Sequence, residues 1–481
     1  MKKMRKIFAV LLTLAMVLGM SMTAFAADAK AIITLKNFDK ANKVEYMQII
    51  QKDETKTSGW AFVNGAGACF TAAFELNDSD DAQQQVIWGL IQYKDNSVVL
   101  PTGVTATEAT AAKIDLALSK VAALTGFTEA TDKDKTKIEV SAAGVYAIKA
   151  EETGFTYKTA TAYVGFGEPY PTLTGAEVTA KKSPTSVDKT VADDDHVVAI
   201  GDIVTYTIEA YVPFIDAANT DNRTFTITDK ITGADYYLAG PNSVNSVTME
   251  GKDGQVGEIV VNKDGKGFTI DLSKLVEDTA NPNAGKKITV TYTAKIKELT
   301  VENTAGSHTA DVEYGGNNVP VKLFTGEITL LKYGDSDVTN VLKDAEFEVS
   351  KDEAATPLKF KLQENGNYRY APDAEVASTV VKTNAEGKIV VEGLNVGTYH
   401  FKETKAPEGY SINTDGKDIT LTQTGVATGI VKASDKLNDT KLNALPSTGG
   451  IGTTIFTIGG CAIMIVAAGL FFASRKKSDN K

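Results

Sequence analysis

The chain has few of the residues from which disulfide frameworks and metal sites are built. Its 481 residues include two cysteines, Cys69 and Cys461, and three histidines that lie far apart in the sequence. These numbers exclude a disulfide framework and a cysteine-ligated zinc site, and they argue against a histidine-rich metal centre or a Ser-His-Asp hydrolase. We therefore expect no bound metal and no cofactor.

Positive charge is also in short supply. The chain has 50 Lys and Arg residues against 61 Asp and Glu residues, a formal net charge of −11. A nucleic-acid-binding protein would carry a basic face, so this class of partner is not expected. Apolar residues make up 43% and charged residues 23%, which is typical of folded domains. The length allows about three such domains.

The N-terminus has the layout of a secretory signal peptide. Four of the first six residues are basic, an apolar run follows over 7–20, and small residues precede the bond between Ala26 and Ala27. An uncleaved membrane anchor is the alternative, but the run is short for a span of about 20 residues. We predict that residues 1–26 are removed on export by cleavage between Ala26 and Ala27.

The C-terminus predicts a membrane anchor. The apolar run 451–473 contains no charge, and the tail 474–481 is basic, as is typical of a transmembrane helix with a cytoplasmic tail. A five-residue motif stands directly before the run: Leu445, Pro446, Ser447, Thr448 and Gly449. The three parts in this order resemble the cell-wall sorting signal of Gram-positive surface proteins, although a single-span protein could carry the motif by chance. The resemblance implies that a sortase cuts between Thr448 and Gly449 and joins the product to the cell wall.

The body between the two ends predicts a mainly β protein. Short alternating stretches rich in Val, Ile, Thr, Tyr and Phe are separated by Gly, Asn and Asp turns, which indicates tandem immunoglobulin-like β-sandwiches. Helical spacing over about 107–124 predicts one helix in the first domain. We expect an N-terminal domain at 27–172, a middle domain at 173–323 and a third domain at 324–441.

The third domain carries the most specific internal motif. Tyr399 and Glu403, followed by Ala406-Pro407-Glu408-Gly409-Tyr410, resemble the collagen-adhesin B-type domain of Gram-positive pilins and adhesins. The middle domain resembles the isopeptide-forming domain of major pilins, and the first, through residues 46–50, their N-terminal domain. The resemblance implies a structural pilus-shaft subunit whose partners are a sortase, neighbouring pilin subunits and peptidoglycan, with a tip adhesin or host ligand left unnamed. It implies no enzyme beyond self-directed bond formation. A monomeric wall-anchored adhesin built from the same domains is the alternative.

Strand alternation points several charged residues into the predicted cores. Lys332 is in phase with Ile328 and Leu330, and Glu403 is in phase with Tyr399 and Phe401. Lys189 and Asp229 alternate in the same way with the apolar residues of the middle domain. A buried charge is costly and tends to neutralise, although these side chains could instead end their strands and reach water.

The pilin resemblance gives these residues a role. In that family a Lys amine attacks an Asn or Asp side chain while an acidic residue transfers protons. The implied set in the third domain is Lys332, the proton shuttle Glu403 and the acceptor Asn438, with Asp435 as the alternative. In the middle domain it is Lys189, the shuttle Asp229 and Asn303, because His308 stands where the family has Asn. The lysine that receives the next subunit is expected at Lys181, or else at Lys182.

Overall fold

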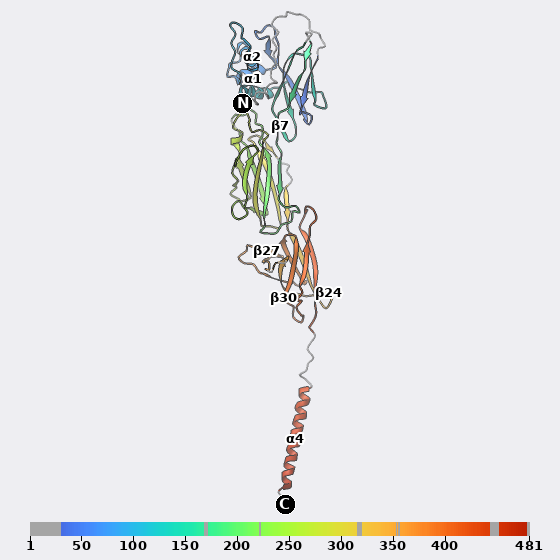
Figure 1. Ribbon diagram of the computed structural model, residues 1–481. Helices are drawn as coiled ribbons and strands as arrows, with labels where there is room; N and C mark the ends of the chain where they lie inside the picture. The colour runs from blue at the N-terminus through green and yellow to red at the C-terminus, as the bar shows by residue number, and fades with distance from the viewer. Residues whose placement is uncertain are drawn as a thin grey trace. The chain divides into compact units, whose positions relative to one another are not determined.

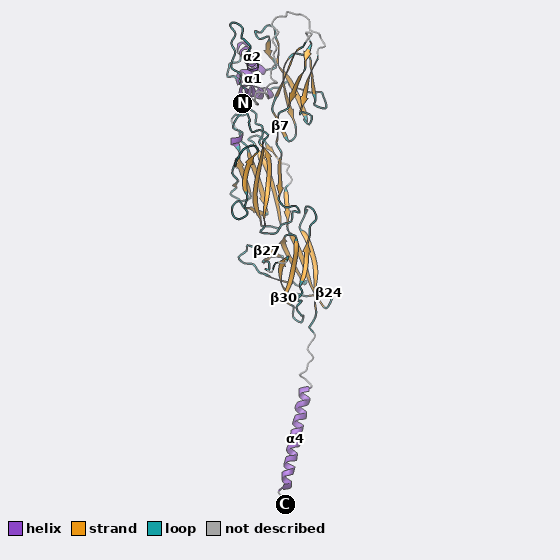
Figure 2. Ribbon diagram, in the orientation of Figure 1, coloured by secondary structure: helices purple, strands orange, loops and turns teal. Residues whose placement is uncertain are grey.

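The computed structural model describes residues 30–167, 172–220, 223–314, 320–352, 354, 356–442 and 452–478 (Figure 1). The predicted signal peptide, with its cleavage point at Ala26 and Ala27, and the motif at 445–449 lie outside this range. Within it strands outnumber helices and every domain contains sheets, so the mainly β fold is as predicted (Figure 2). It divides into two compact units, and the main boundary between them falls between Phe324 and Thr325.

The N-terminal domain combines sheets with three helices, so the expectation of a single helix is wrong. Its largest sheet has the order β3-β2-β6-β8-β9, with β4 on β2, while β1 joins β5 and β10 in a smaller sheet. The elements are β1 (Ala31–Lys36), β2 (Lys43–Lys52), β3 (Trp60–Phe62), α1 (Ala66–Ala73), α2 (Asp80–Lys94), α3 (Ala111–Ala122), β4 (Thr128–Glu129), β5 (Lys137–Val140), β6 (Gly144–Glu151), β7 (Phe155–Tyr157), β8 (Ala160–Phe166), β9 (Leu173–Thr174), β10 (Ala176–Thr179) and β11 (Lys182–Pro184).

The helix α3 is the predicted one, and α2 shows why another was missed. In α3, Ile114, Leu118 and Val121 form the buried stripe. In α2 the run of three glutamines at 83–85 hides the apolar periodicity, although Trp88 is buried. The signal that was present is at the start of α2, where the Ser79 hydroxyl accepts a hydrogen bond from the Ala82 N–H at 3.2 Å.

The N-terminal domain also extends further than the boundary expected at residue 172. Strand β10 pairs in parallel with β1, and β11 pairs with β7, so both belong to sheets of this domain. The first strand of the middle domain is β12, which starts at Val187. The junction therefore lies between Pro184 and Val187.

The middle domain is a sandwich of two sheets. One has the order β12-β13-β19-β15 with β16 on β19, and the other β17-β18-β14-β20-β21 with β22 on β20. Its elements are β12 (Val187–Val191), β13 (Ile203–Tyr211), β14 (Thr226–Thr232), β15 (Ala234–Tyr236), β16 (Asn245–Met249), β17 (Val260–Val261), β18 (Gly267–Asp271), η2 (Ser273–Leu275), β19 (Lys287–Ile296), β20 (Thr300–His308), β21 (Glu313–Tyr314) and β22 (Val321–Phe324).

The third domain is a smaller two-sheet sandwich closed by its last strand. The order is β24-β23-β29-β27-β26 in one sheet, with β32 parallel to β23, and β28-β25-β30-β31 in the other. Its elements are β23 (Gly326–Gly334), β24 (Asp337–Val341), β25 (Glu346–Lys351), β26 (Phe360–Leu362), β27 (Tyr368–Tyr370), β28 (Val380–Lys382), β29 (Lys388–Leu394), β30 (Gly397–Lys405), β31 (Lys417–Leu421) and β32 (Val431–Asp439).

The predicted membrane anchor is a helix. Helix α4 (Gly452–Ser478) includes the stretch Ile455–Arg475, which is long and apolar enough to cross a membrane. None of the side chains of its most apolar window is buried against the rest of the protein. The helix is therefore available to lipid.

Candidate functional site

A lysine lies fully buried in the core of the third domain. Lys332, on β23, has no exposed side-chain surface, and its Nζ contacts Oδ1 of Asp439 and lies 3.2 Å from Oε1 of Glu403. Both carboxylates are also fully buried, and they come from the strands β32 and β30. One amine and two carboxyl groups therefore meet in the core of the domain, as strand alternation predicted for Lys332 and Glu403.

Burial controls the charge of this cluster. Desolvation raises the pKa of Glu403, while the Asn413 N–H at 2.7 Å and the charge of Lys332 oppose the shift. A buried carboxyl whose pKa is raised holds a proton readily and can pass it on. Oε1 of Glu403 and Oδ2 of Asp439 accept no hydrogen bond from the described residues. A buried carboxylate oxygen without a hydrogen-bond donor is costly, and formation of a bond at Asp439 would remove that cost there.

The predicted partners Asn438 and Asp435 are not beside Lys332, and that part of the prediction is wrong. The Asn438 side chain points away and accepts a hydrogen bond from the Ser336 N–H at 2.8 Å. Asp435 is partly exposed and forms an ion pair with Lys417 at 2.8 Å. Asp439 takes the position expected for the acceptor.

Asp439 could have been found from the same alternation that identified Lys332. Ala433, Asp435 and Leu437 share one face of β32, and two further residues along that face lead to Asp439, which is 1% exposed. The sequence prediction names Asp435, on this same face, only as the alternative to Asn438, which the family resemblance favours.

The middle domain holds a second buried cluster, built from the predicted residues. Nζ of Lys189, on β12, contacts Oδ2 of Asp229, on β14, and both side chains are almost fully buried. Nζ also lies 2.5 Å from the Tyr292 hydroxyl, which accepts a hydrogen bond at 2.8 Å from Nδ2 of Asn303. The amine and the amide therefore meet at one phenol oxygen.

His308, the departure from the family pattern, lies outside this cluster. Its ring Nε2 is 2.9 Å from the Thr228 hydroxyl. Asn303 is instead on the buried face of β20 and is fully enclosed. The amide group is thus supplied from an earlier residue of the same strand.

Desolvation again determines protonation in the middle domain. It lowers the pKa of Lys189 to about 8, against the opposing attraction of Asp229, and it raises the pKa of Asp229. Tyr236 and Tyr292 donate hydrogen bonds to Oδ1 of Asp229 at 2.7 and 3.0 Å. A substantial fraction of the Lys189 amine is therefore neutral, and hence nucleophilic, near physiological pH.

The two candidate linking lysines have different surroundings. Lys182 forms an ion pair with Glu152 at 2.5 Å and lies over the ring of Phe155 at 4.3 Å. Lys181 is exposed, and partial desolvation together with the nearby charge of Lys158 lowers its pKa. Reaction with an incoming carbonyl requires an accessible amine, which favours Lys181.

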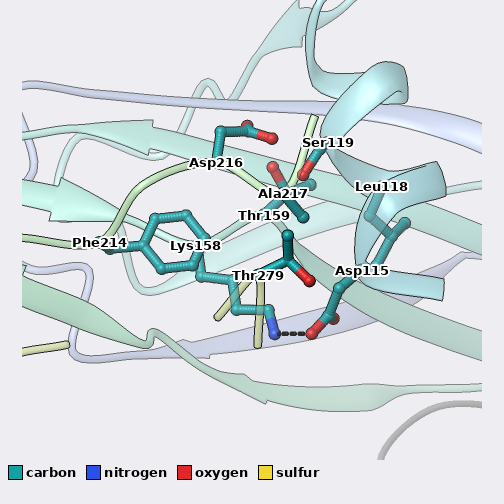
Figure 3. A pocket seen from close by; sticks show the side chains of 9 residues that line it. All are labelled: Asp115, Leu118, Ser119, Lys158, Thr159, Phe214, Asp216, Ala217 and Thr279. Atoms are coloured by element: carbon teal, nitrogen blue, oxygen red, sulfur yellow. Dashed lines mark hydrogen bonds and ion pairs between the residues drawn. The ribbon is translucent and has the colours of Figure 1, made fainter. Parts of the chain in front are cut away.

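A small pocket lies next to the backbone of Lys181. Lys158 and Asp115 form an ion pair at 2.5 Å inside it, with Leu118 and Phe214 among the lining side chains (Figure 3). The Lys158 N–H donates to the Lys181 carbonyl at 2.9 Å, so the two lysines lie side by side just beyond the paired strands β7 and β11. No cluster of three or more metal-ligating side chains occurs in the described part of the chain.

Two protein families match the C-terminal part of the chain. Residues 326–436 match the prealbumin-like fold domain of the SpaA family, and residues 438–480 match the LPXTG cell wall anchor motif. The C-terminus of the chain therefore carries an LPXTG cell wall anchor. The precursor spans the membrane through α4, and the expected wall-anchored location is confirmed.

Comparison with known proteins gives a curated surface protein and solved pilin structures that are similar to this chain. The trypsin-resistant surface T6 protein of Streptococcus pyogenes serotype M6 is 24% identical over an alignment that covers 21% of this chain and 31% of the relative. The chain thus spans about a third of the length of this curated relative. The three-domain T6 backbone pilin structure, from the same serotype, is similar with a TM-score of 0.53 and 15% identity, over 87% of this chain and all of that one. The full-length major pilin SpaD of Corynebacterium diphtheriae gives a TM-score of 0.49 and 17% identity, over 89% and 100%. The expected resemblance to Gram-positive major pilins is confirmed, and the fold is that of a backbone pilin.

Proposed function

We propose that the protein is the structural shaft subunit of a pilus, joined to its neighbours by a sortase and stabilised by internal isopeptide bonds. The observation that carries the proposal is the fully buried Lys332 between Glu403 and Asp439. Burying the charged groups of this triad in a hydrophobic core costs free energy even when they are paired, whereas an amide bond between two of them removes two buried charges.

In the third domain the bond joins Lys332 to Asp439. The Lys332 amine attacks the side-chain carboxyl carbon of Asp439, and protonated Glu403 polarises that carboxyl group. A carbon–nitrogen bond forms, a carbon–oxygen bond breaks, and Glu403 delivers the proton with which the leaving oxygen departs as water. Glu403 then recovers a proton from the amine nitrogen, so it acts as a shuttle and is not consumed.

In the middle domain the bond joins Lys189 to Asn303. Neutral Lys189 attacks the amide carbon of Asn303, so a new carbon–nitrogen bond forms and the bond from that carbon to the Asn303 amide nitrogen breaks. The leaving nitrogen takes a proton from Asp229 and departs as ammonia, and Asp229 recovers a proton from the Lys189 nitrogen. Tyr292 holds the amine and the amide on its hydroxyl before reaction, at 2.5 and 2.8 Å. Close placement of the two groups replaces the encounter that an intermolecular reaction needs.

Assembly joins the C-terminal end of one exported chain to a lysine near the junction of the first two domains of the next. Sortase transfers the carbonyl of Thr448 to the amine of Lys181 in a neighbouring subunit, and the last transfer joins the chain to peptidoglycan. Lys181 is favoured over Lys182 because Lys181 is exposed, whereas only 19% of the Lys182 side chain is exposed. Neither reaction makes the protein an enzyme, since each bond forms once.

Cell-wall extracts test the assembly. Lys181→Ala should abolish the high-molecular-weight ladder in denaturing gels, and the matched variant Lys182→Ala should retain it. If both variants keep the ladder, a different lysine joins the subunits. If the wild-type protein gives a single band, the protein is a monomeric wall-anchored adhesin.

A further inference from the structure

The loop 406–416 lies between β30 and β31. It contacts Glu403 directly, and it contacts Asn438, the residue before Asp439. Its residue Asn413 donates its backbone N–H to Oε2 of Glu403 at 2.7 Å. The side-chain Nδ2 of the same residue donates to the main-chain carbonyl of Asn438 at 3.1 Å. One residue is thus bonded to the proton shuttle and to the peptide group that precedes the acceptor.

Holding the Asn438 carbonyl controls where the Asp439 side chain points. That carbonyl belongs to the peptide plane that also contains the Asp439 nitrogen, so fixing it restricts the rotation that aims the Asp439 carboxyl at Lys332. The other side of the same segment is held by the Asp335 N–H, which donates to the Asp439 carbonyl at 2.9 Å. The end of β32 is therefore held from two directions.

The Asn413 side chain is itself fixed in the orientation that this bond needs. Its Oδ1 accepts a hydrogen bond from the Asp415 N–H at 3.2 Å, which leaves Nδ2 directed at β32. The side chain is half-buried.

Two other residues of the loop contact β23 and the residue that follows β32. Ser411 bonds through its N–H and its hydroxyl to the Thr440 carbonyl, both at 3.0 Å. The ring of Tyr410 lies on Gly334, where an added Cβ would come within 2.5 Å of the ring. Gly334 is paired with Asp439 in the ladder of β23 and β32, so the tyrosine closes the loop directly over the acceptor.

We propose that Asn413 is a positioning residue for the Lys332–Asp439 bond, which it promotes by holding Glu403 and the Asn438–Asp439 peptide at a fixed separation. The inference rests on the proposed function, because it concerns the rate of that bond's formation. Asn413 touches neither the amine nor the carboxyl that react.

Pulse-labelled synthesis of residues 27–448 tests the inference. Samples are denatured at intervals, and the faster migration of the cross-linked chain in a denaturing gel gives the half-time of bond formation. Asn413→Ala should lengthen the half-time roughly fivefold, the effect of losing one hydrogen bond. Asn413→Asp, which keeps the shape but lacks the donor, should be slowed at least as much. Ser411→Ala, in the same loop, keeps its main-chain bond to Thr440 and should change the half-time less than twofold.

Two further measurements separate positioning from loss of structure. In a Lys332→Ala background, where no bond can form, Asn413→Ala should leave the third domain folded at the assay temperature. In the single variant Asn413→Ala, the rate of bond formation should depend on pH as it does in wild type. The backbone donor to Glu403 remains in this variant, and Lys332 and Asp439 still face the Glu403 carboxyl from β23 and β32. A general loosening of the loop would remove the N–H bond, raise the pKa of Glu403 and move the alkaline limb of the profile to higher pH.

The outcomes are distinct for the two proposals. Equal half-times for wild type, Asn413→Ala and Asn413→Asp would overturn the positioning role while leaving the bond itself established. A shifted pH profile, an unfolded control or equal slowing by Ser411→Ala would reduce Asn413 to a structural residue. A wild-type chain that never forms the bond would overturn the proposed cross-link, and the positioning role with it.

Discussion

At the scale of single residues, the buried lysines are the features that distinguish this chain from an ordinary row of β-sandwiches. Lys332 and Lys189 each face a carboxylate in a core, where an isolated charge is strongly unfavourable. Both could be predicted from sequence, because alternation along a strand assigns a residue to one face without knowledge of the fold. The resemblance alone could not select Asp439 over Asn438. It implies that the acceptor is an Asn or an Asp, but it does not say which face of β32 carries the acceptor.

The identity of the acceptor in the third domain can be tested by mass. Wild type should lose one water at the Lys332–Asp439 bond, whereas Asp439→Asn should lose one ammonia and give the same cross-linked product. Asp439→Ala should lose neither. Asn438→Ala is the control, and its peptide map should still show the loss of one water at Lys332. If the cross-link is lost in Asn438→Ala but kept in Asp439→Ala, the acceptor is Asn438.

A pH dependence follows from the depressed pKa of Lys189. In Asn303→Ala, which cannot form the bond, the folded state holds Lys189 with a pKa of about 8, against 10.5 for the unbound side chain. The unfolded chain then binds more protons than the folded one between these values, so the stability of the middle domain should rise with pH from about 8 to 10.5. Thermal melting of Asn303→Ala across this range should show the rise.

The control for the pH effect removes the lysine. Asn303→Ala combined with Lys189→Met keeps the same cavity and the same tyrosines, so the difference between the two variants isolates Lys189. Parallel melting curves across the range would show that Lys189 is not desolvated in the folded domain.

At the scale of secondary structure, the alternating strands and one amphipathic helix were predictable, while short or polar elements were not. Helix α3 presents apolar residues at helical spacing, but α2 has glutamines where that spacing needs apolar residues. The expected boundary at residue 172 assigns β10 and β11 to the middle domain, whereas they pair with β1 and β7 of the N-terminal domain. Such pairing joins residues far apart in the sequence, and a local sequence pattern does not contain it. Long-range pairing also decides that β32 lies beside β23.

The start of α2 gives a test of the N-terminal domain. Ser79→Ala removes the hydroxyl that accepts from the Ala82 N–H, and it should lower the free energy of unfolding by about 1 kcal/mol. Both tryptophans, Trp60 and Trp88, are buried in this domain, so fluorescence during chemical denaturation follows it selectively. Ser97→Ala, at an exposed site beyond the C-terminal end of α2, should leave the midpoint unchanged; equal losses in both variants would contradict the capping role.

At the scale of the whole molecule, the proposed bonds determine how the chain resists unfolding. Lys332 and Asp439 are 107 residues apart, so a bond between them closes almost the entire third domain into a loop. Force that enters through Thr448 passes from Asp439 directly to Lys332 and leaves most of the strands of that domain unloaded. A covalent link of this kind raises the barrier to unfolding more than any set of non-covalent contacts.

Loss of the third-domain bond should therefore be visible as a loss of thermal stability. A cross-link that closes a loop of about 100 residues stabilises by roughly 4–5 kcal/mol in the chain-entropy account. Lys332→Ala should lower the Tm of the third domain by roughly 20 °C or more and make it sensitive to trypsin. Lys432→Ala removes an exposed lysine from β32 and serves as the control, with a change of a few degrees at most.

The intact mass of residues 27–448, expressed without sortase, tests the central claim most directly. We predict a mass below that of the sequence by one water and one ammonia, with peptide mapping placing the bonds at Lys332–Asp439 and Lys189–Asn303. A mass equal to that of the unmodified sequence would contradict the account, because the buried lysines would then be ion pairs and not the precursors of covalent bonds.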